Sequence, residues 1–201
     1  MSRRIAAIIP AAGQSKRMGQ PKMLLPWGSS TVLGKVVSSL AEAGIEEIIV
    51  VTGARREKIE ALIADLAHNF PVRSVHNNAY QTGEMLSSLQ RGLAEPGPQV
   101  EAALIALGDQ PQIRPGTIRS LRQSFETSSA RIVVPSHHMR RGHPWLVARS
   151  LWAEIRALGP ENTARDFLNE HALEISYVEI GSASILEDLD TPEDYQHADC
   201  D

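Results

Sequence analysis

A short stretch near the N-terminus combines small side chains with clustered positive charge. The residues from Pro10 to Gly13 are small, which lets backbone N–H groups approach a ligand closely and form a cradle for an anion. Lys16, Arg17 and Lys22 follow within seven residues, and no carboxylate lies near them in the sequence. A tight turn with solvated bases is the alternative. Because neighbouring cations without an anion are unfavourable, we interpret the loop as a site for phosphate groups.

The spacing of the glycines excludes two common phosphate loops. A P-loop has four residues between its glycines and then a Lys-Ser/Thr pair, whereas Gly13 and Gly19 are separated by five residues and Gln20 follows. The Gly-x-Gly-x-x-Gly fingerprint of dinucleotide-binding proteins is also absent from this stretch. The loop is therefore of another kind.

Three aspartates are the candidate metal ligands. Asp109 follows an apolar run, where a side chain at a strand end enters a cleft; a turn or helix-capping aspartate is the alternative. Asp188 and Asp190 are two residues apart, so in an extended segment they share a face. Asp190 could instead serve the short helix that Thr191 and Pro192 are expected to open. Together with a phosphate loop, these carboxylates favour Mg²⁺, which binds carboxylates and phosphates.

Alternating apolar and amphipathic segments predict the elements that position these side chains. Strands are expected at 5–10, 47–52, 72–75, 102–107, 131–135, 143–148 and 173–180. Helices are expected at 31–43, 55–66, 83–93, 115–125, 150–158 and 163–171. This alternation predicts a three-layer, Rossmann-like, doubly wound α/β fold, with a mainly parallel sheet and a small antiparallel extension at 143–148. Sites in such sheets lie at the carboxyl ends of strands, here after Pro10, Thr52, Val75 and Leu107.

Length and composition exclude several classes of protein. The 201 residues are 42% hydrophobic and 22% charged, as in globular proteins and unlike disordered chains. We find no apolar run of the roughly 18 residues that a membrane span needs, and expect no membrane association. A single cysteine, Cys200, allows no internal disulfide. We therefore expect a cytoplasmic protein with one domain over 1–201.

The net charge of −4 excludes a broadly basic nucleic-acid binder, but the charge is unevenly distributed. Residues 1–41 hold six Lys or Arg and no acid, whereas residues 166–201 hold eleven Asp or Glu and no Lys or Arg. The basic segment contains the phosphate loop, and the acidic segment contains Asp188 and Asp190. We expect the fold to bring these two segments together around one metal ion.

Five motifs, in order along the chain, resemble one enzyme family. The segment 11–26 reads Ala-Ala-Gly-x-Ser-x-Arg-Met-Gly-x-x-Lys-x-Leu-Leu-Pro, and the other motifs lie at 83–93, 107–111, 142–144 and 188–195. They resemble the MobA/MocA-like nucleotidyltransferases, which move NMP from an NTP onto a phosphate, and above all the molybdenum cofactor cytidylyltransferases. The resemblance implies transfer of CMP from CTP to molybdopterin, with release of pyrophosphate and with Mg²⁺ as cofactor.

The resemblance also implies roles for individual residues. Arg17 and Lys22 would neutralise the triphosphate as catalytic residues together with Asp109, which would bind Mg²⁺. One of Asp188 and Asp190 would be the second metal ligand, and we favour Asp190. The residues implied to bind the nucleotide are Ala11, Ala12, Gly13, Ser15, Arg17, Lys22, Gly83, Ser88 and Asp109.

The base and the acceptor are expected to contact different parts of the chain. In the similar enzymes Ala-Ala-Gly accompanies cytosine and Ala-Gly-Gly accompanies guanine, so Ala12 implies CTP, its methyl group leaving less room for a purine. Ser88 would touch the nucleoside, or else be a hydroxyl on the helix surface. Arg141 and His143 would meet the acceptor phosphate, or else belong to a solvated basic loop.

These assignments divide the domain into two halves. Residues 1–135 would form a nucleotide-binding half and residues 136–201 a half that binds the acceptor and completes the metal site. The alternatives are NMP transfer to a sugar or alcohol phosphate and a nucleotide-binding protein without turnover. A molybdoenzyme or its chaperone is the protein partner that a molybdopterin product would require.

Overall fold

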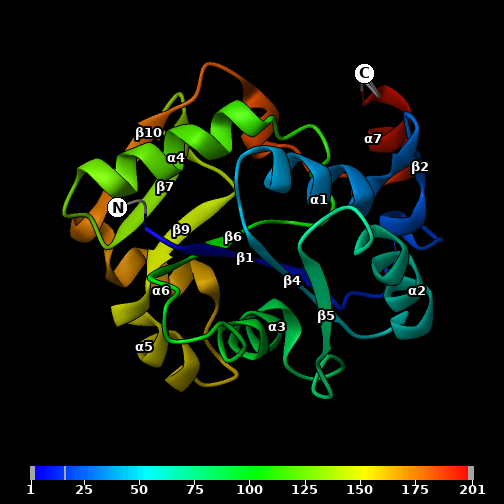
Figure 1. Ribbon diagram of the computed structural model, residues 1–201, viewed down its shortest axis with the longest axis horizontal. Coiled ribbons are helices and arrows are strands. Elements are labelled where there is room, and N and C mark those ends of the chain that lie inside the picture. Colours follow the sequence, from blue (N-terminus) through cyan, green and yellow to red (C-terminus); the bar gives the residue numbers. More distant parts are fainter. Residues whose placement is uncertain (1–2, 16, 199–201) are drawn as a thin grey trace.

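An eight-stranded sheet lies at the centre of the fold, with the strand order β10-β7-β9-β6-β1-β4-β5 and with β8 added to β7 (Figure 1). The computed structural model describes residues 3–15 and 17–198, so Lys16 and Cys200 lie outside the described residues. The strands of the sheet are β1 (Ile5–Ala11), β4 (Glu47–Thr52), β5 (Val72–His76), β6 (Ala102–Ile105), β7 (Ile132–His137), β8 (Arg140–Arg141), β9 (Trp145–Ala148) and β10 (Ile175–Glu179).

The directions of the strands confirm the predicted sheet. β1 pairs in parallel with β4 and β6, and β4 pairs in parallel with β5. β9 runs antiparallel to both β6 and β7, and β10 is parallel to β7. The antiparallel extension thus lies where the sequence predicts it. As a result, the carboxyl ends of β1, β4, β5 and β6 share one edge of the sheet.

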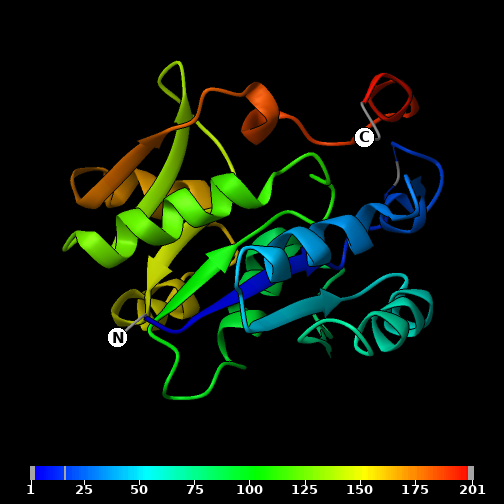
Figure 2. The same cartoon turned by 45° about the horizontal axis from the view of Figure 1, so that its top comes forward.

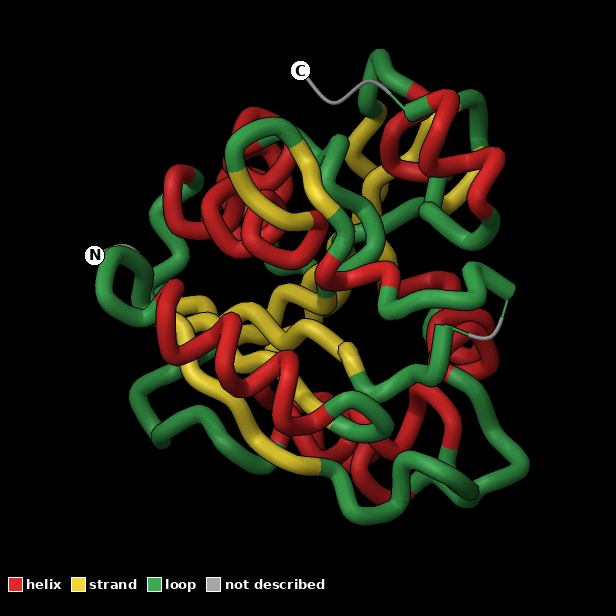
Figure 3. Tube along the Cα trace, turned by 90° about the vertical axis from the view of Figure 1, so that its right-hand side faces the viewer, coloured by secondary structure: helices red, strands yellow, loops and turns green. Residues whose placement is uncertain are grey.

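Helices cover both faces of the sheet, which gives the predicted three layers (Figure 3). The longer helices are α1 (Val32–Glu42), α2 (Arg56–Leu66), α3 (Glu84–Leu93) and α4 (Pro115–Thr127). The shorter ones are α5 (Trp152–Ala157), α6 (Ala164–Glu170) and α7 (Pro192–His197). α1, α2 and α4 pack on one face, and α3, α5 and α6 pack on the other. Among the described residues, we find no helix with the length and apolar character of a membrane span.

Local signals in the sequence explain where several helices begin and end. Thr31 caps α1, because its side chain accepts a hydrogen bond from the Gly34 N–H at 3.0 Å. Gly44, the residue after the C-cap of that helix, has a φ of 82°, a left-handed conformation that glycine adopts without strain. Pro115 occupies the first turn of α4, as expected of a residue whose missing N–H has no helical partner there.

A small hydrophobic cluster at the edge packs the segment 18–32 against the C-terminal segment 189–198 (Figure 2). β2 (Pro26–Trp27) and β3 (Ser30–Thr31) form a separate antiparallel ribbon that the sequence patterns do not predict. Its cluster contains Met18, Leu25, Trp27, Val32 and Leu189, with Tyr195 and Ala198 packed against it. Residues from the acidic segment therefore pack directly on the basic loop and the ribbon that follows it.

Candidate active site

The loop after β1 is anchored at Ala12 and exposed at Gly13. Ala12 is buried, and its carbonyl oxygen accepts a hydrogen bond from the Ala54 N–H at 3.1 Å. A Cβ at Gly53 would lie 2.6 Å from the Cβ of Ala12, so a glycine is needed for these two loops to approach so closely. At the exposed Gly13, by contrast, an added Cβ would meet no heavy atom within 4 Å. The start of the loop is therefore fixed against the loop after β4, whereas Gly13 is free to approach a ligand.

Lys22 is the cation at the centre of the site. Its Nζ donates to Oδ2 of Asp109 and, at 2.9 Å, to Oδ1 of Asp190. The lysine and Asp109 side chains are each only 14% exposed. Burial lowers the pKa of Lys22, but the two carboxylates outweigh that effect and raise it above the usual value. Lys22 is therefore a permanent positive charge in the site.

Arg17 adds a second cation to the same carboxylate. Its Nη2 lies 2.8 Å from Oδ2 of Asp190, while its side chain remains 72% exposed. Both oxygens of Asp190 consequently face the basic loop. The alternative role for Asp190, at the start of α7, is filled by Thr191 as the N-cap and by Asp194, whose Oδ2 accepts from the N–H groups of Asp190 and Thr191.

Asp109, Asp188 and Asp190 form a carboxylate cluster. Each offers an oxygen, and the three oxygens lie within 4.8 Å of one another. Burial and the charges of its two neighbours raise the pKa of Asp188, although Lys22 and Arg17 oppose this rise. Such convergent carboxylates suit a hard divalent cation, whose charge would relieve the repulsion among them. The cluster includes both Asp188 and Asp190, whereas one of the two is expected from the sequence to be a metal ligand.

The segment that carries Asp188 and Asp190 is anchored at several points. Between them, Leu189 is buried, and its N–H donates to the Asp109 carbonyl oxygen at 3.1 Å. After them, Thr191 caps α7 and forms a reciprocal capping box with Asp194. Before them, a 3-10 turn, η4 (Ala183–Leu186), packs on the sheet through the fully buried Ile185. These anchors hold the two carboxylates against Asp109.

The start of α3 packs against the loop after β5, and Ser88 points inward. Gly83 precedes α3, where a Cβ would lie 2.6 Å from Oγ of Ser87. Ser88 is only 1% exposed, and its hydroxyl accepts a hydrogen bond from the side-chain amide of Asn77 at 3.1 Å. The structure therefore does not put this hydroxyl on the exposed helix surface.

The two residues expected to bind the acceptor lie in different surroundings. The His143 N–H donates to the Ile185 carbonyl oxygen at 3.0 Å. Burial lowers the pKa of its imidazole to about 4, against the opposing effect of Asp109. Arg141 instead donates to the Tyr177 hydroxyl at 2.8 Å and to the Asn169 side chain at 2.9 Å. Of this pair, His143 is the residue that interacts electrostatically with the carboxylate cluster.

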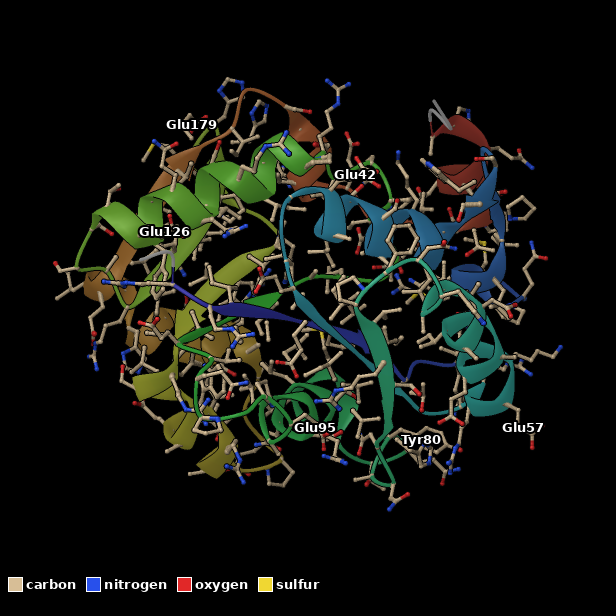
Figure 4. The ribbon with its side chains drawn as sticks, in the orientation of Figure 1. Glu42, Glu57, Tyr80, Glu95, Glu126 and Glu179 are labelled. Carbon is tan, nitrogen blue, oxygen red and sulfur yellow. The ribbon has the colours of Figure 1, made fainter. Side chains whose placement is uncertain are left out.

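Two hollows flank the basic loop. The first, about 390 Å³, is lined by Gln14, Ser15, Gly19, Ala54, Arg55 and Tyr80. The second, about 780 Å³, is bordered by Arg17, Gln112, Arg114 and much of the segment 182–198. Tyr80, labelled in Figure 4, belongs to the loop that follows β5.

Sequence motifs alone did not single out the further lining residues Arg55, Tyr80 and Arg114. The first two follow β4 and β5, so the strand-end rule does point to their loops. Arg114 follows β6 by more residues, and its place in a hollow depends on the distant segment 182–198. That juxtaposition leaves no local signal in the sequence.

A comparison with protein-family models supplies the context for this site. The model described as the MobA-like NTP transferase domain matches residues 7–175. The chain belongs to the MobA-like NTP transferase family. It is thus a member of a nucleotidyltransferase family, whose enzymes bind an NTP and a phosphorylated acceptor and use a divalent metal.

Two relatives of this family member match it over nearly its full length. The molybdenum cofactor cytidylyltransferase of Escherichia coli K12 is 33% identical, over 95% of this chain and 93% of the relative. The nicotine blue oxidoreductase of Paenarthrobacter nicotinovorans is 29% identical, over 94% of this chain and 93% of the relative. Proteins named for different reactions therefore resemble this chain to a similar extent.

Solved structures share the fold over almost the whole chain. Rv0371c from Mycobacterium tuberculosis H37Rv superposes with a TM-score of 0.82 at 26% identity, covering 98% of this chain and 97% of the other. A second structure of Rv0371c is described as a complex with manganese, with a TM-score of 0.78 at 25% identity, covering the same shares. A nucleotidyl transferase of Methanothermobacter has a TM-score of 0.79 at 26% identity, covering 96% of this chain and 94% of the other.

Proposed function

We propose that this MobA-like NTP transferase moves CMP from CTP onto the phosphate of molybdopterin, with Mg²⁺ as the metal and pyrophosphate as the second product. The observation that carries the proposal is the position of Lys22, which joins the phosphate loop to Asp109 and Asp190. A cation, a phosphate loop and three convergent carboxylates are what the transfer of a charged nucleotidyl group requires. We propose the cytoplasm, which supplies CTP and Mg²⁺, as the place of reaction.

In the proposed reaction an oxygen of the acceptor phosphate attacks the α-phosphorus of CTP. A new P–O bond forms, the bond from the α-phosphorus to the bridging oxygen breaks, and that oxygen leaves on pyrophosphate. The acceptor phosphate is already mostly ionised near neutral pH, so the step needs no general base. Lys22 and Arg17 stabilise the negative charge that moves onto the leaving group.

The carboxylates are suited to hold the metal. Asp109, Asp188 and Asp190 would bind Mg²⁺, which when bound neutralises phosphate charge and aligns the displacement. The oxygens of the cluster are hard ligands of the kind that Mg²⁺ prefers. The neutral, partly buried imidazole of His143 would face the acceptor phosphate beside this cluster as a hydrogen-bonding group rather than as a cation.

The identity of the base is supported by the loop sequence. Ala11, Ala12 and Gly13 match the pattern that accompanies cytosine in the similar enzymes. The methyl group of Ala12 lies where the loop approaches Gly53, so it narrows the space between the two loops. We therefore expect CTP to bind more tightly than GTP or ATP. Ala12→Gly should reduce the difference in affinity between CTP and GTP.

The test is pyrophosphate release from CTP with three acceptors in parallel: molybdopterin, a sugar phosphate and water. We expect release with Mg²⁺ and molybdopterin, coupled one to one with formation of the CMP adduct. Release with a sugar phosphate alone would favour the alternative acceptor. Tight CTP binding without release for any acceptor would contradict enzymatic transfer, and a preference for GTP would contradict the assigned base.

A further inference from the structure

The second hollow lies next to the carboxylate cluster and away from the first. Asp188, Asp190 and Arg17 lie on its wall, whereas Gln14, Ser15 and Gly19 line the first hollow. The two hollows share no lining residue, and the basic loop contributes to both. A transfer reaction needs such an arrangement, because the attacking oxygen of the acceptor and the leaving pyrophosphate must lie on opposite sides of the α-phosphorus of the donor.

Arg114 gives the second hollow an available positive charge. It is the exposed N-cap residue of α4, a helix of 13 residues. Within the described part of the chain, its guanidinium makes no hydrogen bond or ion pair, in contrast to Arg17, which pairs with Asp190. An arginine guanidinium can bind a phosphate with two parallel hydrogen bonds. The first turn of α4 contains no acidic residue that would oppose an anion there.

Two serine hydroxyls border the same hollow. Ser182 and Ser184 border the hollow, and the Ser182 hydroxyl donates to that of Ser184 at 3.1 Å. The side-chain amide of Gln112 donates to the carbonyl oxygens of Ser184 and Glu187, at 3.2 Å and 2.5 Å. These bonds tie the serine segment to the residues just before α4. The serines and Arg114 therefore border the same hollow, in segments that Gln112 joins.

The acids of the hollow are mostly engaged elsewhere. Asp194 belongs to the capping box of α7, and Asp190 contacts Lys22 and Arg17. Asp188 belongs to the carboxylate cluster, where a metal ion would offset its charge. Glu187 remains as an exposed carboxylate at the rim. Arg114 is thus the group that would make this wall attractive to an anion.

We propose that Arg114, assisted by the hydroxyls of Ser182 and Ser184, binds the phosphomonoester group of the acceptor in the second hollow. The inference rests on the proposed transfer to a phosphate and names the residue that selects an anionic acceptor. It moves the main acceptor contact from Arg141, whose guanidinium is engaged with Tyr177 and Asn169, to Arg114.

The first experiment maps protection of arginines from phenylglyoxal by mass spectrometry. The protein is saturated with Mg²⁺ and α,β-methylene CTP, so that the donor site is filled and no transfer occurs, and phenyl phosphate is the probe. We expect the probe to slow modification of Arg114 severalfold while Arg141 and Arg119 react at unchanged rates. Equal modification of Arg114 with and without the probe, or protection of Arg141 instead, would overturn the inference.

The same experiment separates this inference from the proposed function. If the CTP analogue alone fails to protect Arg17 from modification, the assignment of the donor site is wrong. Protection of Arg114 by phenyl phosphate is measured separately and tests the acceptor site. Protection of Arg114 by the analogue alone would make it a donor residue and would also overturn the inference.

Kinetics provide the second test, with molybdopterin as the varied substrate. Loss of a charge-assisted hydrogen bond typically weakens binding on the order of tenfold or more, so Arg114→Ala should raise the KM for the acceptor by about that factor. The KM for CTP should stay unchanged, and Arg114→Lys should restore part of the loss. Arg119→Ala, in the same helix, is the matched control because Arg119 donates to the Glu42 carbonyl oxygen. An unchanged acceptor KM in Arg114→Ala would contradict the inference.

Discussion

Lys22 contacts two carboxylates that come from distant parts of the chain. It is the last cation of the basic loop, and its ammonium group reaches Asp109 and Asp190 at the far side of the site. Because these contacts hold its pKa above the usual value, Lys22 stays protonated across the physiological range. Its charge is therefore available to a triphosphate at any pH at which the protein works.

Replacing either partner of this contact should stop transfer without unfolding the chain. We expect Lys22→Ala and Asp109→Asn each to lower kcat on the order of 10²-fold or more, since each removes charge that stabilises the transition state. Steady-state rates of pyrophosphate release provide the measurement, with circular dichroism to verify folding. Lys58→Ala, at an exposed position in α2, is the control. Near-normal turnover in either site variant would contradict these roles.

At the scale of single elements, close backbone contacts set the position of the metal-site segment. A Cβ at Gly142 would overlap the carbonyl oxygen of Ile185 in η4. The next N–H, that of His143, donates to this same oxygen. The glycine thus lets the turn before β9 dock against η4, which leads into Asp188 and Asp190. Backbone atoms meet here, so a side chain at residue 142 has no flexible neighbour to displace.

Gly142→Ala should therefore destabilise the segment that carries Asp188 and Asp190, although residue 142 is not part of the carboxylate cluster. We expect a loss of about 1–3 kcal/mol in the free energy of unfolding, as for overpacked interiors, together with weaker metal binding. Urea denaturation measures the first effect and Mn²⁺ titration the second. Gly116→Ala in α4 is the matched control, because a Cβ there meets no heavy atom within 4 Å. Equal stability of the two variants would show that the contact with η4 is dispensable.

The face of the sheet that α3, α5 and α6 cover has an ionic contact that depends on pH. The ring of His171 follows α6 and contacts Glu174 at 2.9 Å and Glu154 of α5 at 2.5 Å. Burial lowers the pKa of His171, but the two carboxylates raise this pKa by a larger amount, so the net shift is upward. The charged contact thus stabilises the protein fully below the usual histidine pKa and is lost as pH rises through the raised value.

His171→Gln should consequently cost more stability at pH 5.5 than at pH 8.5. Glu174 stays ionised at the lower pH, because hydrogen bonds from His171 and Arg131 lower its pKa, so protonation of this carboxylate does not weaken the contact there. Urea denaturation at both pH values is the measurement. His68→Gln is the control, because the His68 ring contacts the Asp65 carbonyl oxygen rather than carboxylates. An effect that grows with pH would contradict the assigned contact.

At the scale of the whole molecule, the sequence predicts the sheet and its helices better than the site. A continuous β-branched run predicts β4 at the residues where it occurs, and the antiparallel strand expected at 143–148 is found as β9. The sequence patterns miss the β2–β3 ribbon, whose two-residue strands are too short to show any pattern. Residue types predict the proximity of Lys22 and Asp190, whereas Arg114 depends on a tertiary contact with the segment 182–198.

Ligand binding should stabilise the entire domain, because the site joins the basic and acidic segments. At a hundred times the dissociation constant, a ligand that binds only the folded state adds about 2.7 kcal/mol to the free energy of unfolding. We expect Mg²⁺ with CTP to raise the Tm of the wild-type protein and Asp190→Asn to abolish most of that rise. Glu193→Gln, at an exposed position in α7, should keep the full rise. Equal shifts in both variants would exclude Asp190 from the site.

The contact between Lys22 and Asp190 spans 168 residues of chain. During synthesis, the basic loop and nearly all of the sheet leave the ribosome before the segment that carries Asp188 and Asp190. A nascent chain that has reached β10 therefore holds a lysine with only one of its two carboxylate partners. The activity that we propose for this protein can begin only after translation of the segment that closes the site, however early the central strands have folded.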